Sequence, residues 1–120
     1  MMIDPARGEV WLVNLGSGHG HEQMGQRPAL VLSVDEFNQG PADLVILAPI
    51  TSKTLKSGNI PAHIAVSPPD GDLKTASVVL CDQVRTVSKD RMIRRWGILS
   101  SRPLALVENA IRILLGLRCQ

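Results

Sequence analysis

The stretch HEQMGQRPALVLS, residues 21–33, changes abruptly from a polar loop with a glycine to an almost continuous apolar run. A short apolar run next to turn-forming residues is typical of a buried β-strand. Residues Ala29–Val34 therefore predict a core strand, with Arg27 and Pro28 where it begins. Because buried strands do not usually open on a cation, Arg27 either pairs with a carboxylate such as Glu22 or is held out for a ligand.

Further apolar runs predict that the chain is mainly β. Each run is rich in valine, isoleucine or leucine, and glycine, proline or polar residues separate one run from the next. One short polar segment, DEFN at residues 35–38, is long enough for a single helical turn. Strands are expected at Val10–Leu15, at DLVILAPI (43–50), at AHIAVS (62–67), along the whole of SVVLCDQVRTVS (77–88), and near IRRWGILS (93–100).

The last segment has a different period and predicts one amphipathic helix. Apolar residues recur at helical spacing from Leu104 to Leu114. Ser100 or Ser101 can cap the start of this helix, and Pro103 suits its first turn. Gly116 then marks the expected end, because glycine is favoured just after the last helical residue.

Size and pattern together favour one small β domain spanning residues 1–120. Short strands, close turns and a single packing helix suit a small curled sheet or partly open barrel, whereas a parallel βαβ fold needs helices between its strands. The longest apolar run, residues 44–50, is far shorter than the ~20 residues of a membrane-spanning helix. The first residues also lack the apolar region of a signal peptide, so we expect a cytoplasmic protein with no membrane segment.

Charge is distributed unevenly along the chain, although the net charge is only +2. Residues 1–50 carry two basic and six acidic side chains, and residues 51–120 carry eleven basic and five acidic. Much of the basic excess lies between Arg85 and Arg102. Such a segment either attracts a phosphate-bearing partner or forms a solvated face.

Neither a metal centre nor a covalent nucleophile is expected. His19, His21 and Glu22 lie in a loop whose glycines leave them unpositioned, which favours a mobile surface loop over a metal site. The spacing of Cys81 and Cys119 matches no metal motif, and Cys81 lies within an apolar run where a thiol acts as a small hydrophobe. No serine has the sequence context of a nucleophile elbow.

Polar residues in or beside the expected strands are candidates for a ligand site. The planar guanidinium of Arg27 suits a phosphate. Thr51 and Ser52 follow an apolar run, where hydroxyls either donate to a phosphate oxygen or satisfy a turn. Asp82 and Gln83 interrupt another apolar run, which indicates either a polar network or a face that contacts a ligand.

Four blocks of sequence, in this order, resemble the MazF/PemK family of toxin endoribonucleases. The resemblance covers about residues 7–117. The blocks are RGEVWLVNL (7–15), HEQMGQRPALVLS (21–33), VILAPITSK (45–53) and CDQVRTVSKDRM (81–92), and GILS (97–100) and the terminal helix follow them.

The resemblance implies an SH3-like barrel with a C-terminal helix, also described as the CcdB/PemK fold, assembled as a homodimer. It implies cleavage of single-stranded mRNA at selected sequences, without a metal or cofactor, to 2′,3′-cyclic phosphate and 5′-OH ends. A cognate antitoxin with a disordered tail would occupy the toxin's groove. A CcdB-like gyrase inhibitor and a non-catalytic binding module are the alternatives, and the polar tip LGLRCQ (115–120) disfavours the first.

The resemblance also implies roles for individual residues. Arg27 in QRPA, Thr51 in APITS and Glu22 in EQ match catalytic positions of the family. Arg27 stays charged at neutral pH and is expected to stabilise charge on the phosphate, with Glu22 as the candidate base and His21 as its substitute. The glycine-rich stretch 16–20 resembles a loop that reorders over substrate or antitoxin. RNA contact is implied for Ser52, Gln83, Arg85, Gln23, His21 and Lys53.

Overall fold

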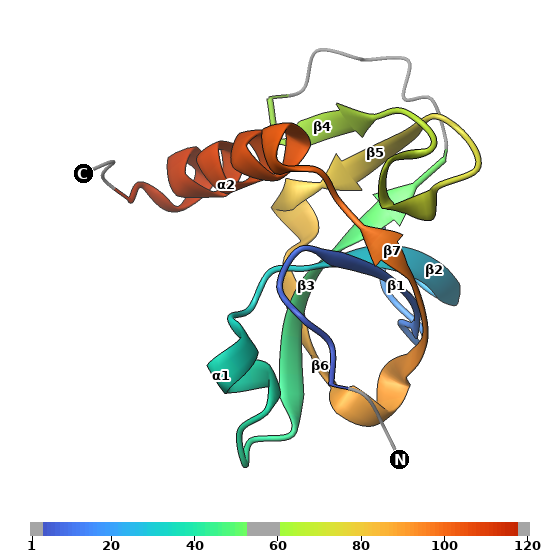
Figure 1. Ribbon diagram of the computed structural model, residues 1–120, viewed down its shortest axis with the longest axis vertical. Helices are drawn as coiled ribbons and strands as arrows, with labels where there is room; N and C mark the ends of the chain where they lie inside the picture. Colours follow the sequence, from blue (N-terminus) through green and yellow to red (C-terminus); the bar gives the residue numbers. More distant parts are fainter. Residues whose placement is uncertain (1–3, 53–60, 118–120) are drawn as a thin grey trace.

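A curled antiparallel sheet with a helix at one side forms the molecule in the computed structural model, which describes residues 4–52 and 61–117 (Figure 1). The seven strands lie in the order β4-β5-β3-β2-β1-β7, and β6 also pairs with β3. The mainly β architecture with a C-terminal helix is thus confirmed. The elements are β1 (Glu9–Asn14), β2 (Gln26–Val31), α1 (Asp35–Asn38), β3 (Leu44–Thr51), β4 (His63–Val66), η1 (Asp70–Asp72), β5 (Ser77–Leu80), η2 (Cys81–Gln83), β6 (Arg85–Ser88), η3 (Lys89–Arg91), β7 (Met92–Ile98) and α2 (Ser101–Leu115).

The long strand expected over residues 77–88 is two strands, so that prediction was wrong. β5 pairs with Ile50 and Thr51, whereas β6 pairs with residues 44–47 of the same strand β3. Between them the chain leaves the sheet in η2, opposite Ala48 and Pro49. Pro49 has no N–H to donate, and the polar residues of η2 do not favour a continuous buried strand.

Strand β2 also differs from its expected bounds, because it begins at Gln26 and ends at Val31. Gln26 pairs with Asn14 and Arg27 with Val13, so the backbone ladder continues into residues whose side chains are polar. Arg27 is therefore the second residue of a paired strand, and its backbone position is fixed by β1.

Both predicted helical segments are present. The DEFN turn is α1, and α2 runs from Ser101 to Leu115 with Ser100 at the N-cap. Gly116 ends α2 with a left-handed φ of 68°, a conformation that glycine adopts without strain. The next amide, that of Leu117, then donates to the Arg112 carbonyl at 2.9 Å. Within the described ranges, no helix combines the length and apolar character needed to cross a bilayer.

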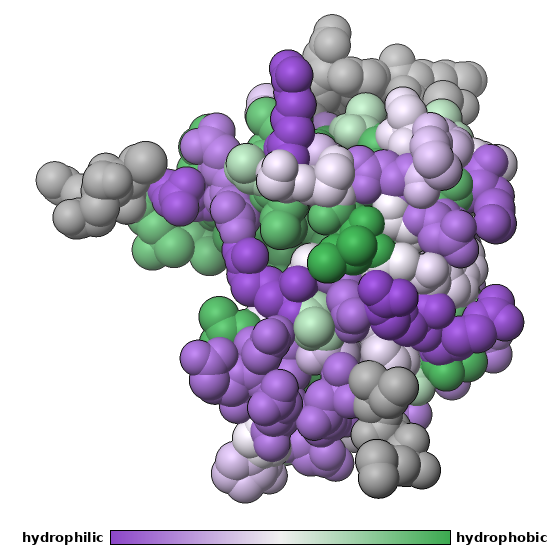
Figure 2. Space-filling view, in the orientation of Figure 1, coloured by the Kyte–Doolittle hydropathy of each residue, from purple (hydrophilic) through white to green (hydrophobic). Residues whose placement is uncertain are grey.

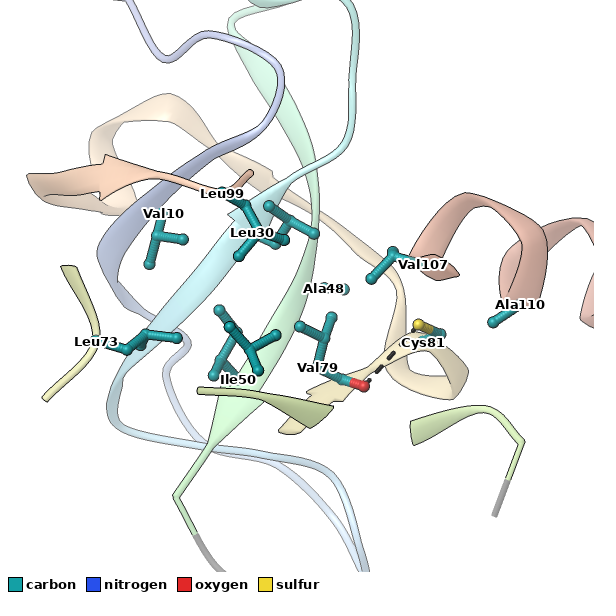
Figure 3. Close-up of a cluster of buried hydrophobic side chains, with 11 residues drawn as sticks. Val10, Leu30, Ala48, Ile50, Leu73, Val79, Cys81, Leu99, Val107 and Ala110 are labelled. Carbon is teal, nitrogen blue, oxygen red and sulfur yellow. Dashed lines mark hydrogen bonds between the residues drawn. The ribbon is translucent and has the colours of Figure 1, made fainter. Parts of the chain in front are cut away.

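Apolar residues cover both faces of the sheet and form two clusters. Val10 and Leu30 belong to the cluster beneath α2, whereas their chain neighbours Trp11 and Ala29 belong to the other. Side chains alternate between faces along a strand, so a sheet covered on both faces needs nearly continuous apolar runs. Figure 3 shows Val107 of α2 among the strand residues of the first cluster.

One buried polar residue, Asn38, joins α1 to the rest of the fold. Asn38 has 0% relative exposure, and its side-chain N–H groups donate to the Pro5 carbonyl at 2.9 Å and the Ser33 carbonyl at 3.0 Å. Its oxygen accepts a hydrogen bond from the Ser33 hydroxyl. The Asn38 amide therefore satisfies two backbone carbonyls, one of them where the chain has just left β2.

We predict that Asn38→Ala lowers the free energy of unfolding by about 2–5 kcal/mol, because it leaves buried carbonyls without their donors. Chemical denaturation of both proteins measures this difference. Gln39→Ala, at the exposed neighbouring position, is the control and should change stability by no more than about 0.5 kcal/mol. Equal stabilities for the two variants would contradict the proposed role of Asn38.

Candidate RNA-cleavage site

Arg27 lies at a cavity of about 200 Å³ where β2, β3, β5 and β7 meet. Its Nε donates to the Met24 carbonyl at 3.2 Å, which ties the guanidinium to the preceding loop. Among the described residues, Arg27 forms no ion pair, so the expected alternative of a pair with Glu22 is wrong. Other polar side chains that line this Arg27 cavity are Gln26, Ser52, Lys74, Thr75 and Ser77.

Thr51 and Ser52 have different surroundings although they are adjacent. Thr51 is only 3% exposed and pairs with Val78 at the end of β3. Ser52 is exposed and lines the Arg27 cavity. Ser52 and Arg27 therefore line the same cavity, whereas the buried Thr51 is not among the residues that line it. Lys53 lies outside the described residues.

Glu22 lines a different cavity, of about 430 Å³, together with Asp82, Gln83 and Arg85. One oxygen of Glu22 accepts a hydrogen bond from the His19 amide at 2.7 Å. Arg85 donates to the Leu15 carbonyl at 3.3 Å, at the start of the same loop. Of the predicted catalytic residues, Arg27 and Glu22 therefore line separate cavities, and Thr51 lines neither.

Gln83 holds the loop of residues 16–25 against η2. Its side-chain oxygen accepts from the Gln23 amide at 2.9 Å, and its side-chain nitrogen donates to the His21 carbonyl at 3.0 Å. Asp82 lies 3.2 Å from His63 Nε2. The polar pair that interrupts the apolar run thus forms a network, and its residues also line the Glu22 cavity.

The environment of Cys81 does not suit a nucleophile. Burial, and secondarily the charge of Asp82, raise the pKa of its thiol to about 11. The reactive thiolate is therefore scarce at neutral pH. Cys81 is 3% exposed and packs in the core, as expected for a small hydrophobe. Within the described residues, no group of three or more histidine, cysteine or acidic side chains converges as a metal site would require.

Several cations of the basic segment make structural contacts. Arg95 forms an ion pair with Glu9, and Lys89 forms one with Asp4. Burial raises the pKa of Glu9, but hydrogen bonds from Trp11, Ala6 and Arg95 and the charge of Arg95 outweigh it, so the pKa is lowered overall. The surface along β7 is mixed, because Arg94 is exposed and Ile93 and Ile98 are 46% and 59% exposed. Figure 2 accordingly shows both hydrophilic and apolar side chains in this region.

Sequence reasoning missed the residues that complete the Arg27 cavity. Lys74, Thr75 and Ser77 lie more than forty positions from Arg27, and Trp96 lies further still. Their residue types carried no signal, because a serine, a threonine or a core tryptophan occurs in any β domain. Only strand pairing brings them to Arg27.

Known proteins resemble this chain over nearly its whole length. The family described as PemK-like, MazF-like toxin of type II toxin–antitoxin system matches residues 6–115. A protein named endoribonuclease MazF from Staphylococcus saprophyticus subsp. saprophyticus is 37% identical over 111 residues, which are 92% of this chain and 91% of that protein.

Solved structures share the fold. The crystal structure of MazF from Deinococcus radiodurans superposes with a TM-score of 0.82 at 30% identity, covering 96% of this chain and 99% of that one. A MazE–MazF structure from the same organism gives a TM-score of 0.76 at 27% identity, covering 98% and 100%. The expected fold type is thus confirmed.

We predict that Gln83→Ala frees the loop of residues 16–25. Two hydrogen bonds worth about 0.5–1.5 kcal/mol each are lost, so hydrogen exchange at the Gln23 amide should become roughly 5- to 150-fold faster. Exchange measured residue by residue by NMR tests this. Thr86→Ala changes another residue of the Glu22 cavity and is the control. Unchanged exchange at Gln23 would show that Gln83 does not hold the loop.

Proposed function

This chain belongs to the PemK-like, MazF-like toxin family, and we propose that it is the endoribonuclease toxin of a type II toxin–antitoxin pair. The observation that carries the proposal is the position of Arg27. It lies on a paired strand, forms no ion pair within the described residues, and lines a cavity that hydroxyl side chains also line. A guanidinium that is already paired with a carboxylate would bind a phosphate less strongly. Arg27 has no such pair within the described residues and can bind a phosphate.

The proposed substrate is single-stranded mRNA, cleaved at the phosphate that Arg27 binds. The neighbouring 2′-OH loses its proton and attacks phosphorus, the bond to the 5′-oxygen breaks, and that oxygen takes up a proton. The products are a 2′,3′-cyclic phosphate and a 5′-OH end. Arg27 stabilises the charge that develops on the phosphate oxygens, and the strand fixes its position before the reaction. The proposed chemistry uses no metal or other cofactor, because the substrate supplies the nucleophile.

Glu22 is the proposed base, with His21 as its substitute, and Thr51 completes the proposed catalytic set. Glu22 and Arg27 line different cavities, so the loop must leave its Gln83 contacts before Glu22 can reach the 2′-OH beside this phosphate, because a general base must lie within hydrogen-bond distance of the proton that it takes. RNA contact is proposed for Ser52, Gln83, Arg85, Gln23, His21 and Lys53.

The partner and the location of this chain are proposed from its membership of the toxin family. The solved MazE–MazF structures support an antitoxin partner for this chain. We further propose that residues 1–120 act as one domain in the cytoplasm.

A homodimer is proposed from the apolar surface of α2. Ile113, Leu115 and Leu117 are 67%, 66% and 60% exposed. Leu115 and Leu117 also line an apolar groove of about 300 Å³ beside α2. Figure 2 shows apolar side chains gathered along one side of this helix. Large exposed apolar patches on small domains commonly mark an interface.

We predict that Arg27→Ala lowers the rate of RNA cleavage about 10²- to 10³-fold, the typical cost of losing one stabilising donor. Arg27→Lys should also be slow, because a point charge cannot replace the planar fork. Cleavage of a transcript pool in EDTA, with sequencing of the 5′-OH ends, gives both the rate and the recognition sequence. Arg102→Ala removes the same charge from α2, away from the Arg27 cavity, and should retain activity.

An absence of cleavage by the parent protein would favour a gyrase inhibitor or a non-catalytic binding module instead. Near-normal activity of Arg27→Lys would show that the planar guanidinium is not needed and that a positive charge alone is sufficient. Thermal unfolding of each variant separates loss of the cation from loss of the fold.

We predict that Glu22→Gln slows cleavage and removes one ionisation from the pH–rate profile, because the amide cannot accept the 2′-OH proton. His21→Gln should have the smaller effect. Profiles of the parent and both variants on one short RNA test this ranking. A reversed ranking would make His21 the base.

We predict that the protein has a mass of about 26 kDa in solution, twice the 13.0 kDa of one chain. Leu115→Glu should shift the mass towards the monomer, because it places a charge in the apolar surface. Light scattering coupled to gel filtration measures both, with Gln39→Glu just after α1 as the control. A parent protein that is monomeric at all concentrations would refute the homodimer.

A further inference from the structure

Trp96 lines the Arg27 cavity together with Ile50 and Leu73, which form part of the core. It is the only aromatic side chain among the residues that line this cavity. Figure 3 shows Ile50 and Leu73 in the apolar cluster against which Trp96 also packs. The indole therefore packs against the core at the wall of a cavity that the Arg27 side chain also lines.

A β-bulge places Trp96 there. Val10 and Trp11 are consecutive in β1, but they pair with Gly97 and Arg95 of β7, so Trp96 is the extra residue between them. A bulge interrupts the regular alternation of side chains and can turn one of them in a new direction. Gly97 permits close approach here, because a Cβ on it would lie 2.9 Å from the Gly71 backbone.

The indole N–H of Trp96 is buried, and no acceptor in the described residues bonds to it. The other tryptophan differs, because Trp11 Nε1 donates to Glu9 at 3.0 Å. A shielded donor without a protein acceptor is uncommon and calls for an explanation. The buried N–H edge therefore holds the ring against the protein, while other atoms of Trp96 line the cavity.

The size and charge of the cavity define what it can hold. Its volume of about 200 Å³ is below the ~300–1,000 Å³ typical of pockets that enclose a whole small molecule. It therefore suits one unit of a longer chain. Lys74 stands at the cavity with a side chain 79% exposed, and its contact with Asp72 at 3.4 Å is a weak surface pair. Arg27 and Lys74 together favour an anionic chain.

We propose that Trp96 contacts the RNA at the Arg27 cavity and gives one nucleotide next to the scissile phosphate an aromatic surface. This inference rests on the proposed endoribonuclease function and adds a residue to its substrate site. Aromatic rings recognise single-stranded bases by stacking, because every base has a π-face. Trp96 is a residue that binds and orients RNA, while Arg27 acts on the phosphate.

The two tryptophans make a direct test available, because the chain contains only Trp11 and Trp96. In a Trp11→Phe protein, all tryptophan emission comes from Trp96. The probe is a short RNA with the cleavage sequence found for the parent protein and a 2′-O-methyl group at the scissile nucleotide, which blocks attack. Titration with this probe should change the emission until binding saturates.

A Trp96→Phe protein is the matched control, since it reports only Trp11, whose N–H is already bonded to Glu9. Its emission should stay constant during the same titration. In cleavage assays, Trp96→Leu should lower kcat/KM by roughly 5- to 150-fold, the range reported for loss of one base–aromatic stack, mainly through KM. Trp96→Phe should recover part of that loss. Thermal unfolding checks that both variants are folded.

Saturable binding with constant Trp96 emission would overturn the inference while leaving the endoribonuclease proposal intact. So would unchanged kcat/KM in a folded Trp96→Leu protein. If the parent protein cleaves no RNA, the proposed function fails and this inference fails with it. Only the first two results therefore count against the role of Trp96 without counting against the proposed function.

Discussion

Strand β3 is the element on which the other parts of the fold depend. One edge pairs with β2, and the other pairs first with β6 and then with β5. A single eight-residue strand thereby aligns three others and ends at Thr51, beside β5. Disruption of β3 would separate Arg27 on β2 from Ser77 on β5, although both line the same cavity.

Polar side chains, one of them buried, connect the sheet to its loops. Asn38 anchors α1 through the carbonyls of Pro5 and Ser33, and Gln83 holds the loop of residues 16–25 through two hydrogen bonds. These contacts differ in consequence. The Asn38 network is buried and stabilises the fold, whereas the Gln83 contacts lie at the surface, where a loop can leave them at modest cost in free energy.

The arrangement divides the candidate chemistry between a rigid part and a movable part. Arg27, Ser77 and Trp96 are on paired strands, and a rigid strand fixes a side chain more accurately than a loop does. Glu22 and His21 lie in the glycine-containing loop, which is joined to η2 through Gln83. Under the proposed function, the strand residues would bind RNA and the loop would respond to what is bound. Charge stabilisation would then be preorganised, and proton transfer would depend on the loop.

The sequence alone determined most of the local structure, including the strand-forming runs, the α1 turn, and an α2 helix bounded by Ser100 and Gly116. These features depend on residues close in the chain, and the motif blocks around Arg27 and Thr51 identified the family for the same reason. Only the tertiary structure decided that residues 77–88 form two strands, that Arg27 and Glu22 line separate cavities, and that Trp96 and Arg27 line the same one. Each of these depends on pairing between residues that are far apart in sequence. Backbone hydrogen bonds and a bulge in β7 set the register of that pairing, and local residue type does not encode it.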